Sequence, residues 1–406
     1  MDELNNLLVP GEMIRERDTT IKAYAAQYKN ELLHNIIPFW MRYSKDDEHG
    51  GYFTCLQRDG KVFDTDKFMW LQGREVWCFS HLYQHVDKKP EWLEMALHGA
   101  RFMEEHGRDA TGNWYFSLTA GGKPLTQPCN IFSDCFAAMA FGALDRAIPN
   151  SSYRAIALTT FENIVRRGNN WKGTYNKTYP GTRPFKNFAL PMILCNLSIE
   201  LEHILGTEKV NEFIPSLIHE VMEVFYQPGY GLILENVLED GSFSDSYEGR
   251  VTNPGHAIEA MWFMMDLGKR MGDTTLINKA CTIMLDTLEY GWDKDFGGIF
   301  YFLDIKNNPP QQLEWDQKLW WVHVEALVAL AKGYALTGNE RCFKWFKKVH
   351  DYTWQHFKDQ EYGEWYGYLN RQGDPLLTLK GGKWKGCFHI PRALYQVWNT
   401  FENMKN

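Results

Sequence analysis

The segment GRVTNPGHAIEAMWF, residues 249–263, carries the signals that decide how this chain folds. Thr252 or Asn253 can cap a helix, and Pro254 suits the first helical position because the N–H that proline lacks would stay unbonded there. An apolar run follows, from 257 to 264. The segment therefore predicts a helix that begins after a polar turn and buries most of its surface.

The same segment carries two chemically active side chains. His256 and Glu259 are three residues apart, so both project from one face of the predicted helix at its first turn. The segment GCFHIPRALYQVW, residues 386–398, repeats this spacing with His389 and Arg392 where another helix begins. One such histidine is usually a hydrogen-bonded residue at a helix start. Two in corresponding positions favour an acid/base site.

A short pattern recurs along the chain at steps of roughly 60 residues. It consists of an acidic or polar turn, one or two glycines and then alternating aromatic residues, which together predict a β-hairpin. The copies are DDEHGGYFTCLQRDG from Asp46, DATGNWYFSL from Asp109, NNWKGTYN from Asn169, PGYGLILENVLEDG from Pro228, DKDFGGIFYFLD from Asp293 and DQEYGEWYGYLNRQGD from Asp359.

Helical segments accompany the repeat. They are predicted at 12–42 and 66–86, 91–107 and 130–147, 151–167 and 187–205, 208–226 and 254–270, 274–291 and 315–337, and 340–357 and 386–402. An open array would need polar capping repeats, and the end segments resemble the rest. The chain is therefore expected to be all-α: an (α/α)6 barrel of twelve helices with short β-hairpins between helix pairs, its residues 1–406 forming a single catalytic domain.

The two helices of each pair differ in character. First helices such as PEWLEMALHGARFMEEHG are amphipathic, which suits an outer ring, and second helices such as VEALVALAKGYAL are apolar nearly all round, which suits an inner ring. The polar exceptions on the inner helices lie near their N-terminal ends. We expect these residues to meet at one mouth of the barrel, facing the positive helix ends: Arg74, Asp134, Asn187, His256, Glu259, His323, Glu325, His389 and Arg392.

Two further segments supply candidate pocket residues. Trp70, Arg74 and Trp77 share one helical face, and an arginine there can hold a carbonyl or enolate oxygen. Trp321 and Glu325 share another face. We predict that Arg74, Trp77, Trp321 and Glu325 contribute to substrate binding, although an arginine paired with a barrel carboxylate is an equal alternative for Arg74.

Two other polar residues on inner helices have simpler interpretations. His323 is two residues from Glu325 and points away from it, so it is expected to pack between helices. Asp134 is expected to be a structural carboxylate rather than part of the pocket lining.

The composition excludes several classes of function. With 43 Lys+Arg against 51 Asp+Glu, the formal charge is −8, which argues against nucleic-acid and anionic-membrane partners. The acidic N-terminus has no apolar signal region, and no apolar span is long enough for a membrane helix. The eight cysteines are scattered without a C-x-x-C pair, so free thiols in a reducing cytoplasm are expected.

No metal or cofactor motif is present in the sequence. There is no H-E-x-x-H, no Cys/His cluster, no dinucleotide fingerprint, no complete Walker A and no G-x-S-x-G.

Two histidines, two arginines and two glutamates around an aromatic cavity suit proton transfer at a carbon next to a carbonyl. Glycoside hydrolysis would need two facing carboxylates instead, and Glu259 with Glu325 leave that alternative open.

The motifs QGREVW, NPGHAIEA, KLWWVHVEAL and KGCFHIPRALY, with the hairpins DDEHGGYF and EWYGYLNRQGD, resemble those of the N-acylglucosamine 2-epimerase family, which includes the renin-binding proteins of animals. The resemblance covers nearly the full length. It implies an (α/α)6 barrel that interconverts N-acetylglucosamine and N-acetylmannosamine. By motif, the required histidines fall on His256 and His389, and the site residues on Arg74, Arg392, Glu259 and Glu325.

Related branches of the family are the cellobiose 2-epimerases and aldose–ketose isomerases, which carry a further histidine near the start of the sixth helix. Here RPFKNFALPMILCNL has none, and His323 stands where the cellobiose branch usually has glutamine. Both differences favour the N-acylglucosamine branch. The alternative functions are those of the other two branches, a glycoside hydrolase and a non-catalytic binding protein. The resemblance also implies a homodimer and ATP as an activator that is not consumed, although no ATP motif is found.

Overall fold

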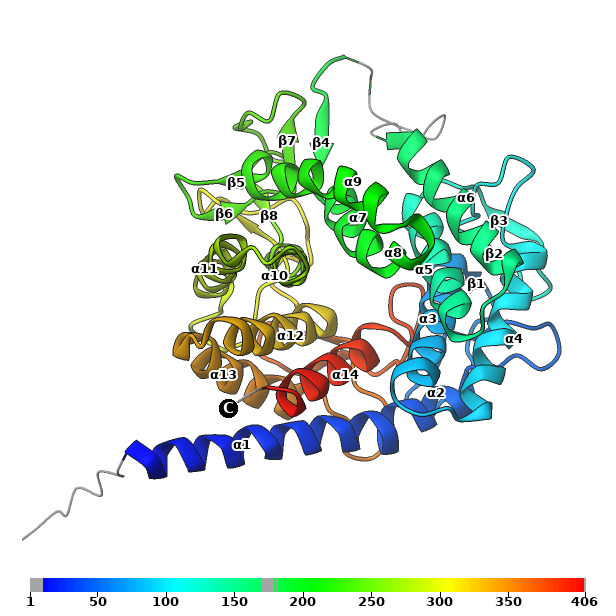
Figure 1. The fold of residues 1–406 in the computed structure, drawn as a ribbon, viewed down its shortest axis with the longest axis horizontal. Helices are drawn as coiled ribbons and strands as arrows, with labels where there is room; N and C mark the ends of the chain where they lie inside the picture. Colours follow the sequence, from blue (N-terminus) through cyan, green and yellow to red (C-terminus); the bar gives the residue numbers. More distant parts are fainter. Residues whose placement is uncertain (1–9, 169–178, 180, 405–406) are drawn as a thin grey trace, which may run out of the picture.

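Twelve helical segments form two concentric rings in the computed structural model, which describes residues 10–168, 179 and 181–404 (Figure 1). The inner ring comprises α3 (Met69–His85), α5 (Ile131–Ala147), α7 (Ala189–Glu200), α10 (Pro254–Met271), α12 (Trp320–Thr337) and α14 (His389–Glu402). Consecutive inner helices pack side by side from α3 to α14. The predicted (α/α)6 barrel is confirmed.

The outer ring covers the inner one. It comprises α1 (Pro10–Glu31), continued by η1 (Leu32–Ile36) and α2 (Ile37–Tyr43), then α4 (Pro90–His106), α6 (Ser151–Arg167), α9 (Thr207–His219) with η4 (Glu220–Val224), α11 (Thr274–Gly291) and α13 (Glu340–His356). The short α8 (Glu202–Leu205) links α7 to α9. The α1 helix packs against α14, so the N-terminal helix also covers the C-terminal one.

The helix boundaries follow the local signals of the sequence. At α10, the Asn253 side chain accepts a hydrogen bond from the N–H of His256 at 3.1 Å, and Pro254 occupies the first turn. Thr252, the alternative cap, instead donates its hydroxyl to the carbonyl of Ile233 at 2.8 Å. Asn253 is therefore the cap that sets where α10 begins.

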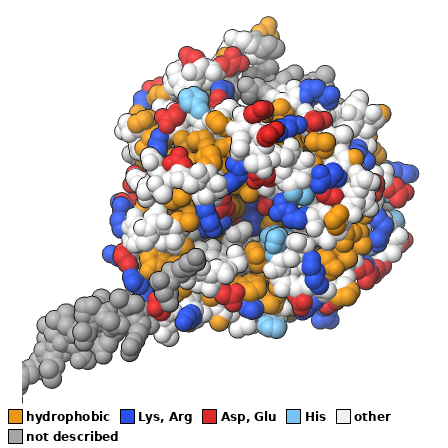
Figure 2. Space-filling view, in the orientation of Figure 1, with side chains coloured by type: hydrophobic (Ala, Val, Ile, Leu, Met, Phe, Trp, Pro, Cys, Tyr) orange, Lys and Arg blue, Asp and Glu red, His pale blue; other side chains and the backbone are white. Residues whose placement is uncertain are grey.

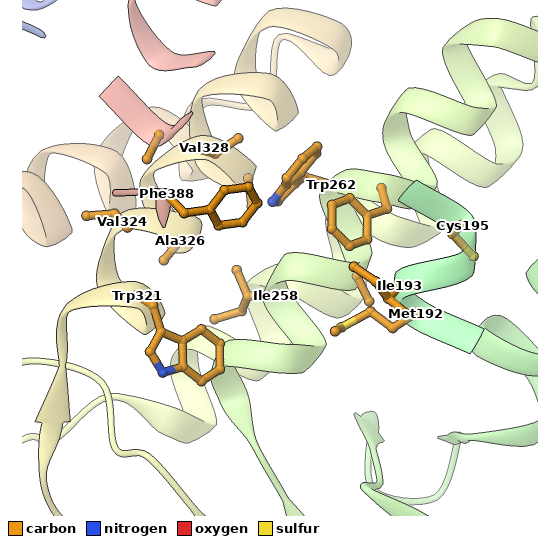
Figure 3. Close-up of a cluster of buried hydrophobic side chains, with 14 of the residues drawn as sticks. Met192, Ile193, Cys195, Ile258, Trp262, Trp321, Val324, Ala326, Val328 and Phe388 are labelled. Carbon is orange, nitrogen blue, oxygen red and sulfur yellow. The ribbon is translucent and has the colours of Figure 1, made fainter. Parts of the chain in front are cut away.

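Most of the inner helices are buried nearly all round, as their composition predicts. In α12, every residue from 320 to 334 is buried. Figure 3 shows where the inner ring meets: side chains of α7 and α12 approach Ile258 and Trp262 of α10, with Phe388 beside them. The ring closes because Phe388, just before α14, contacts Trp77 of α3 with ring centroids 5.2 Å apart. One hydrophobic core extends from Ile21 to Phe401.

The strands lie in the long connections from each outer helix to the following inner helix. They pair antiparallel as β1 (Lys67–Phe68) with β2 (Ser117–Leu118) and β3 (Pro124–Thr126), β10 (Lys318–Leu319) with β11 (Tyr368–Leu369) and β12 (Pro375–Leu377), β4 (Phe185–Asn187) with β7 (Asn236–Leu238), β5 (Tyr226–Gln227) with β6 (Leu232–Ile233), and β8 (Val251–Thr252) with β9 (Leu303–Asp304). The predicted hairpin at Asn169 lies outside the described residues.

The pairing goes beyond the isolated hairpins that the sequence suggests. Lys67 pairs with Leu118, and Lys318 with Leu369, so a strand that leads into one inner helix joins the hairpin of the next repeat. An isolated two-stranded hairpin is at best marginally stable in water, and the third strand stabilises these two hairpins. These sheets fix the segments that lead directly into α3 and α12 at the mouth of the barrel.

The aspartate that opens the repeated pattern has a structural role. Asp46 accepts hydrogen bonds from the N–H groups of Glu48 and His49 and pairs with the buried Lys67 at 2.6 Å. The same pairing joins Asp293 to Lys318 at 3.0 Å and Asp359 to Lys380 at 2.7 Å, again with both side chains buried. These ion pairs hold the turn against the end of the inner ring.

Charged side chains of both signs are interspersed over the face shown in Figure 2, without a large region of one sign. Among the residues that the structure describes, no helix combines the length and the apolar character needed to cross a membrane. All eight cysteines are free thiols, and seven of them are buried.

Substituting Gly73 of α3 with alanine should destabilise the barrel by about 1–3 kcal/mol, the usual cost of overpacking. A Cβ at Gly73 would lie 2.6 Å from the backbone oxygen of Phe136 on α5, so the two inner helices would have to move apart. Urea unfolding measures the change. Gly229, whose added Cβ would meet open space, is the control, and Gly229→Ala should unfold like the parent. Equal stability of Gly73→Ala and the parent would contradict this packing argument.

Candidate active site

A cavity of about 530 Å³ opens at the end of the barrel where the inner helices begin. The long strand-bearing connections surround this end, whereas short turns close the other. The cavity is lined by Trp70, Arg74, Asn130, Phe132, Phe136, Ala189, Met192, Ile193, His256, Glu259, Tyr301, Glu314, Gln317, Leu319, Trp320, Trp321, Tyr368, Trp384 and His389. Its volume falls in the range typical of small-molecule sites.

A buried ion network joins three inner helices next to the cavity. Arg392 of α14 donates through Nη2 to Glu259 Oε1 on α10 and to Glu325 Oε1 on α12, the latter at 2.6 Å. Each of the three residues is at most 5% exposed. Burial opposes the charge of the guanidinium, but Glu325 and Glu259 outweigh it and raise the pKa of Arg392. The guanidinium therefore stays charged and compensates the two carboxylates.

His389 lies directly against this network. Its Nδ1 donates to Glu325 Oε1 at 2.8 Å, and Glu325 Oε2 accepts from Trp262 Nε1 at 3.0 Å. Burial lowers the pKa of His389 well below its ordinary value, and the positive charge of Arg74 acts in the same direction while Glu259 opposes it. The ring is therefore neutral near pH 7, and because Nδ1 carries the hydrogen, Nε2 keeps its lone pair.

His256 forms a second histidine–carboxylate pair. Its Nδ1 lies 3.0 Å from both carboxylate oxygens of Glu235, in the connection between β6 and β7. Burial opposes a charged ring, but the charge and hydrogen bond of Glu235, with the charge of Glu259, outweigh it and raise the pKa of His256. The two histidines thus differ: His256 keeps a proton to higher pH than His389.

Trp321 separates the two histidines. Its ring centroid lies 5.1 Å from that of His256 and 5.8 Å from that of His389, with both pairs of rings inclined at 37°. Tyr301 contacts the same indole edge-on at 6.0 Å. The indole therefore presents an apolar surface between two proton-carrying rings.

Arg74 supplies a positive charge without a matching carboxylate. Its guanidinium lies 4.1 Å from the ring centroid of Phe136 and 4.5 Å from that of Trp70. Within the described residues it forms no ion pair, and its buried Nε has no hydrogen-bond partner. Burial lowers the pKa of Arg74 to about 9, so it remains charged at neutral pH. A cation of this kind suits an oxygen that becomes negative during a reaction.

The structure brings most of the predicted site residues together. Arg74, His256, Glu259, Trp321 and His389 line the cavity. Glu325 and Arg392 do not line it and instead lie behind His389 and Glu259.

Trp77 departs from the expectation that it binds substrate. It lies outside the cavity lining, its Nε1 donates to Glu200 at 3.1 Å, and its ring stacks on His81 at 4.7 Å. Trp77 follows Arg74 on α3 but lies nearly one helical turn further along the helix. It is therefore deeper in the barrel than the cavity lining.

Two residues have the structural roles that the sequence predicted. His323 is fully buried, accepts the N–H of Ile299 at Nε2 and donates from Nδ1 to the carbonyl of Leu319. Burial lowers the pKa of His323 to about 3. Asp134 pairs with Arg167 at 3.0 Å beneath the outer helices.

Glu235 is the site residue that the sequence analysis missed. It follows Leu232, Ile233 and Leu234 in a segment interpreted only as a hairpin. A glutamate that directly follows three buried apolar residues is an unusual place for a charge and was the available signal.

Glu259, Glu325 and His389 offer ligand atoms within 4.8 Å of one another, which is a spacing that could suit a metal ion. The guanidinium of Arg392, however, already lies between the two carboxylates, and His389 uses its Nδ1 on Glu325. The positive charge that these groups require is therefore supplied by a side chain of the protein.

The sequence profile of the N-acylglucosamine 2-epimerase (GlcNAc 2-epimerase) family matches residues 51–393. The chain belongs to this family. The N-acylglucosamine 2-epimerase of Rattus norvegicus is 38% identical over 397 residues, covering 94% of this chain and 92% of that protein. The human protein of the same name is 38% identical over 400 residues, covering 94% and 91%. The family resemblance inferred from the motifs is confirmed.

The same architecture occurs in solved structures of other proteins. The cellobiose 2-epimerase of Spirochaeta thermophila superposes with a TM-score of 0.80 at 21% identity, covering 95% of this chain and 98% of that one. At this identity the likeness concerns the fold, which is the (α/α)6 barrel described above.

Replacing Arg392 with methionine should destabilise the protein by about 3–5 kcal/mol, because two buried carboxylates lose their cation. Without the guanidinium, buried negative charge is left uncompensated, and this costs more stability at a pH where carboxylates are ionised. Urea unfolding at about pH 5 and pH 8 should show the larger deficit at pH 8.

Arg341 provides the control for this experiment, because its pair with Glu289 is exposed, with side chains 53% and 56% accessible. Arg341→Met should cost less than about 1 kcal/mol at either pH. A deficit in Arg392→Met that is equal to the control, or that shrinks at higher pH, would contradict the role assigned to the network.

Proposed function

We propose that this protein interconverts N-acetylglucosamine and N-acetylmannosamine by moving the proton at C2 of the open-chain sugar. One observation carries the proposal: two histidines at one cavity, His389 buried and His256 partly exposed, are each bound through Nδ1 to a carboxylate, which leaves both Nε2 atoms for chemistry. The names of the mammalian relatives agree with this reaction. The substrate would be a small sugar, and no cofactor is required for the chemistry.

The different states of the two histidines support a division of labour. In one direction, neutral His389 removes the C2 proton while protonated His256 delivers a proton to the opposite face, and the roles reverse in the other direction. Arg74 stabilises the enediolate oxygen that forms between the two transfers. Glu325 and Arg392 act behind the cavity by holding His389 and Glu259, and Trp321 provides an apolar face for the sugar.

A glycoside hydrolase is the less favoured reading. Glycosidases place two carboxylates on either side of the scissile bond. Here Glu259 and Glu325 are bound to the same nitrogen of Arg392, and Glu325 is fully buried outside the cavity lining. A purely binding role is also disfavoured, because every group that proton transfer needs is present and oriented.

The wall of the cavity supports the N-acylglucosamine branch over the cellobiose 2-epimerases and aldose–ketose isomerases. On α7, the cavity is lined by Ala189, Met192 and Ile193, where those branches carry a histidine near the helix start. An apolar wall suits the methyl group of an N-acetyl substituent better than a sugar hydroxyl.

Three expectations remain predictions: a homodimer and activation by ATP, which the family resemblance implies, and a location in the cytoplasm, which the scattered cysteines favour. We propose no nucleic-acid or membrane partner, in line with the acidic net charge.

Incubating the protein with N-acetylmannosamine in deuterated water should yield N-acetylglucosamine with deuterium at C2, detected by proton NMR. N-acetylglucosamine, cellobiose, mannose and glucose would be assayed in parallel. Turnover of the N-acetylhexosamines alone is the expected result. Conversion of only cellobiose or mannose would place the protein in another branch, and product without solvent deuterium would contradict separate bases that exchange with water.

His256→Asn and His389→Asn should each lower kcat by about 10²–10⁴-fold, because each removes one proton-transfer group while keeping much of the side-chain size. His323→Asn should leave kcat of the folded protein near that of the parent, since His323 lies between helices away from the cavity. Steady-state kinetics with purified, folded variants measures these changes in kcat. Loss of turnover in His323→Asn with normal His389→Asn would contradict the assignment.

A further inference from the structure

Each histidine of the cavity is bound through Nδ1 to one carboxylate, but the two carboxylates differ in their surroundings. Glu325 also faces the guanidinium of Arg392 at 2.6 Å and the indole N–H of Trp262, so much of its charge is already compensated. Glu235 forms an ion pair with His256 and, within the described chain, with no lysine or arginine. Its full negative charge therefore acts on His256.

The backbone around Glu235 holds the carboxylate in place. The N–H of Glu235 donates to the carbonyl of Val251 at 2.9 Å, and its own carbonyl accepts the N–H of Phe188 at 2.9 Å. The Asn187 side chain donates to the same carbonyl at 3.3 Å. Glu235 is thus fixed between the segments that lead into α7 and α10, and its side chain is 11% exposed.

We infer that Glu235 is the positioning residue of the acid/base pair, orienting His256 through Nδ1 and holding it as the member that carries the proton in the resting protein. This inference rests on the proposed epimerase function. Orientation follows from geometry, because a carboxylate bound to Nδ1 leaves only Nε2 to exchange a proton with the sugar. The charge follows because His256 is the cationic partner that the described residues give Glu235.

The charged and titratable groups around His256 come from several elements. Glu235 approaches from the β6–β7 connection, Glu259 from its own helix and His389 from α14, while Tyr301 lies near Glu235 from the segment before β9. Glu259 is already engaged by Arg392. Glu235 is therefore the group whose removal should change the protonation of His256 most.

The arrangement makes a prediction about pH. A two-base epimerase works when the histidine pair holds one proton in total, so kcat/KM falls at high pH when that proton leaves His256. Glu235 raises the pKa of His256 together with Glu259, against the effect of burial. Removing the charge of Glu235 should therefore move the alkaline limb of the kcat/KM profile to lower pH. The acid limb, which reflects a second proton on His389, should stay in place.

Glu235→Gln tests the inference, because it keeps the size and a hydrogen-bonding oxygen but removes the charge. We expect kcat/KM above neutral pH to fall on the order of 10- to 100-fold, as when a carboxylate that orients a functional histidine is lost. The alkaline limb should shift to lower pH, and activity should recover partly as pH is lowered. Glu235→Asp keeps the charge and should restore the position of the limb.

Glu239 offers a control just after β7, in the same long segment between α9 and α10, because it is exposed. Glu239→Gln should leave both limbs unchanged. NMR titration of the His256 ring in the parent and in Glu235→Gln provides a readout that needs no turnover, so it tests Glu235 even if the sugar assays show no epimerase activity. An unshifted His256 titration, or a Glu235→Gln profile whose alkaline limb stays with that of the parent, would overturn the inference.

Discussion

The guanidinium of Arg392, buried between Glu259 and Glu325, is the interaction on which the geometry of the site depends. It joins α14 to α10 and α12, three helices that are far apart in sequence and adjacent in the inner ring. Buried charges are costly unless they are paired, so this contact restricts how the three helix starts can be placed relative to one another. His389 then takes its orientation from Glu325, which makes the position of a reactive ring a consequence of the network.

The same network creates a chemical difference between two otherwise similar groups. His256 and His389 both donate Nδ1 to a glutamate. Glu325 shares its charge with Arg392, whereas Glu235 pairs with no arginine among the residues that the structure describes, and the two imidazoles consequently favour different protonation states. A proton-transfer site that serves both faces of a carbon needs one acceptor and one donor at the same pH. Here the surroundings of the carboxylates, rather than the histidines themselves, supply that difference.

The apolar inner ring explains why the chemistry gathers at one end. Helices that are buried on every side leave little room for polar groups along their length, so charges occur where the helices begin and the long strand-bearing connections can reach them. Those connections are held by short sheets between neighbouring repeats and by buried lysine–aspartate pairs. The connection that carries Glu235 is held by the pairing of β7 with β4 and of β8 with β9, which positions Glu235 against a helix start.

The sequence alone determined the helices and the residues at their first turns. Caps such as Asn253, the proline after it and the contrast between amphipathic and apolar helices act over a few residues, so they predict the double ring and place His256 and His389 at helix starts. Only the tertiary structure decided which residues meet. Glu235 reaches His256 across 21 residues, Trp77 lies too deep to touch the cavity, and strands pair between repeats. These outcomes depend on ring closure, which brings distant segments together at depths and in registers that no local pattern specifies.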